Sequence, residues 1–184
     1  MSLERFTRAS ALRTALLYLF ATLTGALGFF AGTAGTVLRE SPSRHAGGAV
    51  NRALLDLLDL SSYAVAALAF LLVLLLDRVE PMSKVQKGLA LRLLALVAAA
   101  AFASHEVITP QMMALRDRLP GIIDLLPKTD PGRTEWGRLH AFSSVVLLVR
   151  LLASTALFVL VSRRPRRTIA VAAAAAGPEE PAAG

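Results

Sequence analysis

The side chains best suited to bind a ligand are concentrated in one stretch of the sequence, residues 103–150. Two imidazoles, a carboxylate and two thioethers lie within it: His105, Glu106, Met112, Met113 and His140. Imidazole and thioether groups bind soft or borderline metals, and thioether sulfur favours copper(I). A copper or haem site is therefore one interpretation. The other is structural, because histidines at helix ends more often bond to backbone carbonyls or to water.

Signatures of catalysis are missing from the sequence. There is no cysteine, which excludes thiolate metal sites and thiol catalysis. His105-Glu106 begins an HExxH zinc motif, but Thr109 occupies the position of the second histidine. No phosphate-binding glycine loop occurs, and no spacing marks a nucleophile beside a base. We expect no enzyme, and no cofactor unless the copper or haem alternative holds.

Arg150 is a charged residue deep inside an apolar run. It lies about 18 Å along a helix axis from Ser162, which places it near mid-membrane. A charge at that depth costs about 2.5–3.5 kcal/mol on insertion scales, and it usually faces the bundle interior with a partner. Asp59 lies about 25 Å from the corresponding end of its own helix, within reach of an arginine stem. We therefore predict an Arg150–Asp59 ion pair. Asp56 and Tyr63 are further candidate partners. The alternative is that Arg150 faces a water-filled cleft and affects only the orientation of the chain in the membrane.

Four long apolar segments must position these residues. Hydrophobic residues make up 55% of the 184 residues, charged residues 18%, and the mean hydropathy is +0.57. Soluble domains carry about a quarter charged residues. Residues 14–38 hold no charge and give about 37 Å of helix, enough to cross a bilayer. The sequence predicts an all-α, integral membrane bundle of four transmembrane helices, at about 14–38, 50–76, 87–106 and 134–162.

The flanking charges predict how the bundle is oriented. Residues 1–13 form a basic N-terminus, residues 14–162 the transmembrane domain, and residues 163–184 a basic flank with a disordered tail. By the positive-inside rule both termini are cytoplasmic and the three histidines lie at the outer mouth. Arginine greatly outnumbers lysine, which suggests a GC-rich bacterial genome and hence an inner membrane. The net charge of +7 then faces anionic lipid, and we expect no nucleic-acid partner.

The first apolar segment carries two further features. Gly25, Gly28, Gly32 and Gly35 recur on one helical face, where small side chains let another helix approach closely. Packing within the same chain is the favoured interpretation, and a homodimer through this helix is the alternative. The segment also resembles a cleaved signal peptide, but its apolar run exceeds the usual length of about 7–15 residues.

The connection between the third and fourth segments predicts a short interfacial helix. Thr109 fits a helix N-cap, and Pro110 fits the first helical position. Pro120-Gly121 would end this helix. We expect it to lie across the mouth of the bundle.

Two short motifs flank this connection, ITPQMMALR at residues 108–116 and GRLHAFS at residues 137–143. They resemble the four-span membrane family of unknown function that includes vertebrate transmembrane protein 205 and many bacterial relatives. Ala46-Gly47 also fits that pattern, whereas Leu147 stands where the family would have asparagine. The resemblance implies a membrane fold and leaves the biochemistry open. We expect a non-enzymatic packing or interaction protein. The alternative is a carrier or sensor for a metal, haem or another small ligand at the outer mouth.

Overall fold

The computed structural model describes residues 3–119, 123, 126–127 and 129–163, and in them it is helical throughout, without strands. Its elements are α1 (Leu3–Glu40), α2 (Arg44–Val79), α3 (Lys84–Phe102), a π-helical turn η1 (Ala103–Ile108), α4 (Thr109–Arg118) and α5 (Pro131–Ser162). Four helices are long and apolar enough to cross a membrane: Leu3–Glu40, His45–Val79, Lys84–Arg118 and Pro131–Ser162. The prediction of an all-helical bundle with four helices long and apolar enough to cross a membrane is therefore confirmed. The tail predicted to be disordered, apart from Arg163, and the helix stop at Pro120-Gly121 lie outside the described residues.

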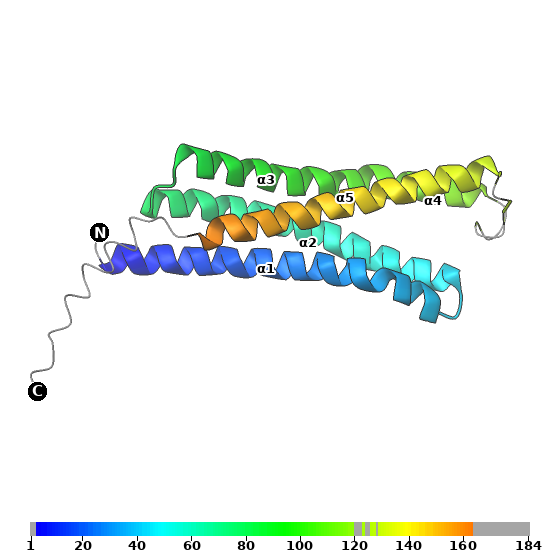
Figure 1. Cartoon of the computed structure of the whole chain (residues 1–184), viewed down its shortest axis with the longest axis horizontal. Helices are drawn as coiled ribbons and strands as arrows, with labels where there is room; N and C mark the ends of the chain where they lie inside the picture. The colour runs from blue at the N-terminus through cyan, green and yellow to red at the C-terminus, as the bar shows by residue number, and fades with distance from the viewer. Residues whose placement is uncertain (1–2, 120–122, 124–125, 128, 164–184) are drawn as a thin grey trace, which may run out of the picture.

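The helices run side by side as an elongated bundle (Figure 1). Close backbone approach joins α1 to α2 and α5, and it likewise joins α3 to α2 and α5. The helices α2 and α5 therefore occupy one diagonal of the bundle, and α1 and α3 occupy the other. The start of α1 and the end of α5 lie at the same end of the molecule.

The core forms along the inward faces of these helices. In α1 the buried residues Leu16, Phe20, Leu23 and Leu27 are three or four positions apart, so they form one stripe along the helix. The same apolar cluster includes Val73 and Leu76 of α2, Leu94 and Val97 of α3, and Leu157 of α5. Large apolar side chains also cover the outside of the bundle, including Tyr18, Phe29, Leu60 and Leu152. A bundle that is apolar both inside and outside suits a lipid environment, because helices satisfy their own backbone hydrogen bonds there.

A tight turn joins α1 to α2. The Ser43 hydroxyl caps α2 by accepting a hydrogen bond from the backbone N–H of Ala46. Gly47 is buried in the first turn of α2, and a Cβ there would lie 3.0 Å from the Leu38 Cα and 3.1 Å from the Val37 carbonyl oxygen. Glycine at position 47 is therefore what allows the two helices to meet so closely.

The structure does not show a separate short helix across the bundle mouth. Instead, α4 continues α3 through η1, so residues 84–118 form one rod that passes the predicted end at Glu106 (Figure 1). Thr109 is itself helical, and its N–H donates to the Ser104 carbonyl five residues earlier. Proline lacks an N–H and its ring conflicts with the preceding helical turn. The widened π-turn just before Pro110 relieves this conflict, which is why the helix continues.

Candidate functional site

A network of polar side chains is buried at the centre of the bundle, around Arg150 and Asp59. Both residues are 0% exposed. The Arg150 Nη1 donates to the Asp59 carboxylate, and its Nη2 donates to the Leu58 carbonyl oxygen at 2.9 Å and to the Ser62 hydroxyl at 2.5 Å. Since α2 and α5 lie on a diagonal, the Arg150 side chain reaches across the bundle interior. Arg150 and Asp59, which were predicted to pair from their distances to the ends of their helices, are thus in contact in the structure.

Ser62 completes this network and was missed by the sequence reasoning. Its hydroxyl donates to the Leu58 carbonyl oxygen at 2.7 Å while it accepts from Arg150. It lies three residues after Asp59, and that spacing puts both side chains on one face of α2. The spacing was therefore a usable signal. Ser104 of η1 is also buried and lies beside the Asp59 carboxyl, although Asp59 Oδ2 itself makes no hydrogen bond.

A second buried polar contact joins α1 to α5. The Thr24 hydroxyl donates to the Ser154 hydroxyl at 3.0 Å, and Ser154 donates in turn to the Leu151 carbonyl oxygen at 3.0 Å. Ser154 lies one turn after Arg150 and is 0% exposed. Polar groups of α5 therefore hold two of the other helices, α1 and α2, at neighbouring depths.

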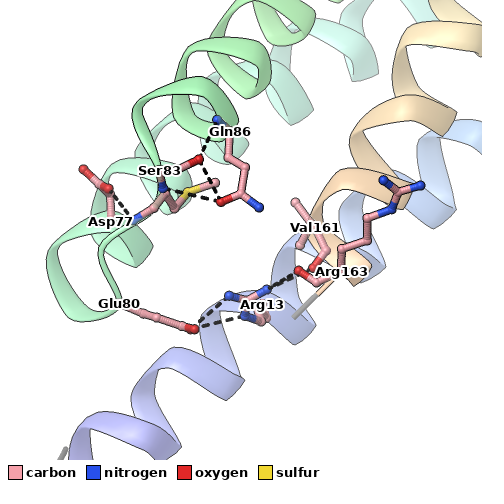
Figure 2. A network of polar contacts seen from close by, with 8 residues as sticks. Arg13, Asp77, Glu80, Ser83, Gln86, Val161 and Arg163 are labelled. Atoms are coloured by element: carbon pink, nitrogen blue, oxygen red, sulfur yellow. Dashed lines mark hydrogen bonds and ion pairs between the residues drawn. The ribbon is translucent and has the colours of Figure 1, made fainter. Parts of the chain in front are cut away.

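A third set of contacts ties the helices together at the end of the bundle where α1 begins (Figure 2). Arg13 of α1 forms an ion pair with Glu80 at 3.0 Å, and both side chains are largely buried. The same guanidinium donates to the carbonyl oxygens of Val161 at 3.2 Å and Arg163 at 3.3 Å. From the sequence, Arg13 counted only as one of the basic residues that predict the orientation of the chain in the membrane. The structure shows it joining α1 to the ends of α2 and α5.

The two histidines of the predicted ligand set have different surroundings in the described residues. The His105 ring lies 3.8 Å from Asp56 Oδ1 and 3.8 Å from Glu106 Oε1. His140 is exposed on α5, and no hydrogen bond or ion pair joins it to His105 in the described residues. Asp56, predicted as a further partner of Arg150, pairs with Arg52 at 3.8 Å and with His105.

The two methionines of that set make other contacts. Met113 Sδ accepts a contact of 2.7 Å from Arg52 Nη1, and Met112 packs against a small apolar cluster of Ala100, Ile108 and Val146. Nearby, Arg116 of α4 contacts the ring of His45 at the start of α2. Across residues 3–119 and 129–163, no group of three or more His, Asp or Glu side chains is arranged to hold a metal ion.

The glycine face of α1 points away from the core for most of its length. Gly25, Gly32 and Gly35 are exposed, and a Cβ at any of them would meet no heavy atom within 4 Å. Only Gly28 approaches another helix, where a Cβ would lie 4.0 Å from the Leu151 Cδ1. Packing within the chain, which the sequence reasoning favoured, therefore accounts for Gly28 alone.

Comparison with protein-family models, with curated proteins and with solved structures finds no match. The relation to the family of transmembrane protein 205 therefore stays a prediction from the motifs at residues 108–116 and 137–143. The arrangement of side chains carries the functional argument instead. It divides into a buried charge network in the centre, in which only Arg150 Nε and Asp59 Oδ2 lack a hydrogen-bond partner among the described residues, and an open glycine face on α1.

Proposed function

We propose that this chain is a non-enzymatic, four-span protein of a bacterial inner membrane that acts by packing against other membrane helices, first of all a second copy of itself. The buried Arg150 network supports a structural role, because its guanidinium donates to three protein groups of α2. Removing one member of such a pair is strongly destabilising, which suits a fixed scaffold. The motif resemblance to the four-span family is consistent with this role.

The observation that carries the proposal is the open glycine face of α1. Its three exposed glycines, Gly25, Gly32 and Gly35, present bare backbone along the helix, while the opposite face is buried in the core. In lipid, close backbone approach at small residues drives helix association. A second copy offers the same surface, and two identical faces can meet about a twofold axis.

Cysteine cross-linking tests the dimer, and the cysteine-free chain is a clean background for it. We expect Gly32→Cys to form a disulfide-linked dimer under mild oxidation in native membranes. Ala67→Cys, at an exposed small residue of α2, is the matched control and should stay monomeric. Adding Gly25→Leu to the Gly32→Cys chain should abolish the cross-link, because the larger side chain holds the helices apart. Equal cross-linking at positions 32 and 67, or none at either, would contradict the proposal.

The proposed orientation places both termini in the cytoplasm. Arg5, Arg8, Arg13, Lys84 and Lys87 all belong to the end of the bundle where α1 begins, and basic residues favour the cytoplasmic side. A membrane-impermeant maleimide applied to spheroplasts should label Pro42→Cys but not Leu3→Cys, both of which replace exposed residues. Labelling of Leu3→Cys without permeabilisation would reverse the orientation.

A ligand carrier or sensor is the second proposal, and one observation favours it. The His105 Nδ1 is buried and has no hydrogen-bond partner. Copper or haem would use the imidazole and thioether groups predicted above. An absorption spectrum with elemental analysis of purified protein tests this version. Stoichiometric copper or a Soret band, lost in the His105→Ala, His140→Ala double variant, would support it, and a colourless, metal-free protein would oppose it.

A further inference from the structure

Arg92 is a charged residue on the outer side of α3. The buried residues of that helix, which include Leu94 and Val97, form one stripe facing the core, and Arg92 lies on the opposite, exposed side. It comes eight residues after Lys84, about 12 Å into a helix that is long and apolar enough to cross a membrane. Charged side chains inside such helices usually face the bundle interior and have a partner there. Arg92 departs from that rule because it faces outward.

Two of the three basic residues of α3 lack a partner. Lys87 forms an ion pair with Asp77 of α2 at 2.7 Å. Neither Lys84 nor Arg92 makes an ion pair or a side-chain hydrogen bond within the described residues. Residues 84–104 contain no Asp or Glu, so this helix offers neither of them an acidic side chain. Two positive charges are therefore available to a negatively charged group from the surroundings.

Gly88 lies between these two residues on the outer side of α3. Positions 84, 88 and 92 are each four residues apart, so they follow one another along the helix surface. A Cβ at Gly88 would meet no heavy atom within 4 Å, and a glycine lets a ligand come close to the backbone. Long helical side chains point back toward the N-terminal end of their helix, which directs Arg92 over Gly88 toward Lys84. We call the surface formed by Lys84, Gly88 and Arg92 the Arg92 face.

The surroundings of the Arg92 face suit an anion that carries hydrocarbon. Ser83 and Gln86 form a capping box that fixes the first turn of α3 (Figure 2). The N-terminal end of a helix carries partial positive charge, which adds to that of Lys84. Val85 and Leu89 beside the face are 79% and 44% exposed, so apolar side chains adjoin the two cations. A phospholipid combines the same two features, a phosphate and acyl chains.

We propose that the Arg92 face binds the phosphate of an anionic phospholipid. Arg92 and Lys84 donate to the phosphate oxygens, Gly88 lets the phosphate approach the helix, and Val85 and Leu89 contact the acyl chains. A guanidinium can hold two phosphate oxygens at once, and the lysine ammonium adds a point charge. This binding goes beyond the packing role proposed above and does not depend on it, because α1 and α3 lie at opposite corners of the bundle.

Quenching of tryptophan fluorescence by brominated lipids tests the site in the full chain. Trp136→Phe removes the only tryptophan, and Leu89→Trp places a reporter beside the Arg92 face. The protein is reconstituted in phosphatidylcholine nanodiscs that contain increasing fractions of dibrominated phosphatidylglycerol or, for comparison, of dibrominated phosphatidylcholine. One basic residue near a membrane surface raises anionic-lipid affinity about fivefold, so we expect phosphatidylglycerol to bind at least about fivefold more tightly. Equal quenching by the two lipids would overturn the proposal.

Substitutions in the reporter chain separate this site from general attraction by a basic protein. Arg92→Gln should remove most of the preference for phosphatidylglycerol, about fivefold, and Lys84→Gln a smaller part. Arg5→Gln is the matched control, because it removes an exposed positive charge from α1 at the same end of the bundle, and it should leave the preference unchanged. Equal losses in Arg5→Gln and Arg92→Gln would show that net charge alone attracts the lipid and would overturn the site.

Gly88→Leu tests the shape of the site at constant charge. The space around Gly88 accommodates a larger side chain without a clash in the bundle. The leucine would fill the surface between the two cations, so we expect it to lower the preference for phosphatidylglycerol while quenching by brominated phosphatidylcholine persists. An unchanged preference in Gly88→Leu would mean that the phosphate does not lie between Arg92 and Lys84, and it would overturn the proposed geometry.

Discussion

Asp56 and Asp59 lie one turn apart in α2 and have opposite surroundings. The Asp59 carboxylate is fully buried and accepts a hydrogen bond from Arg150 across the bundle. The Asp56 side chain is 38% exposed, and its carboxylate lies 3.8 Å from Arg52 Nε and 3.8 Å from His105 Nδ1. The same residue type thus holds the bundle together at one position and leaves hydrogen-bonding capacity open at the other.

The difference follows from the direction in which each side chain points. Residues three apart on a helix differ by about 60° around its axis. The carboxylate at position 59 meets Arg150 in the interior and lies beside Ser104, whereas the carboxylate at position 56 is half-exposed beside Arg52 and His105. A charge enclosed by protein must be paired, whereas a half-exposed charge is screened and can accept another partner. Three variants test this contrast.

The largest effect is expected from Asp59→Asn. It leaves Arg150 buried without a counter-charge and should lower the free energy of unfolding by about 3–5 kcal/mol. Titration of detergent-solubilised protein with sodium dodecyl sulfate, followed by the fluorescence of Trp136, measures this loss. The double variant Asp59→Leu, Arg150→Met should recover most of the stability, because no unpaired charge remains. A double variant as unstable as the single one would show that the two residues do not act as a pair.

Ser62→Ala should have an intermediate effect. The change removes the hydroxyl that accepts from Arg150 Nη2 and donates to the Leu58 carbonyl, and we expect a loss of about 1–2 kcal/mol in the same titration. Ser61→Ala is the matched control, since Ser61 makes no side-chain hydrogen bond in the described residues. Similar losses at both positions would mean that serine itself, rather than its contact with Arg150, matters.

The smallest effect on stability is expected from Asp56→Asn. Half-exposed ion pairs contribute little, so the free energy of unfolding should change by about 0.5 kcal/mol or less. Equilibrium unfolding beside Asp59→Asn gives the comparison directly. If Asp56→Asn is as damaging as Asp59→Asn, the division between a structural and an available carboxylate fails.

The sequence by itself determined the number of helices long and apolar enough to span a membrane, and the positions of the charged residues along them. Each residue adds a constant rise to a helix, so the number of consecutive apolar residues shows whether a helix is long enough to cross the bilayer. The same constant rise placed Asp59 and Arg150 at depths from which their side chains reach one another. Helix ends were harder to predict. Thr109-Pro110 has the local signature of a helix start, but the π-turn before it let the third helix continue to Arg118.

Only the tertiary structure decided which polar groups face one another. Sequence spacing gives the direction of a side chain around its own axis, but not the rotation of one helix relative to the next. That rotation is set by packing of the whole bundle. It puts Ser62 against Arg150, turns Gly32 outward, and leaves His140 exposed while His105 lies beside Asp56. The sequence determined which helices are long and apolar enough to cross a membrane, and packing decided which of their polar side chains bond to one another.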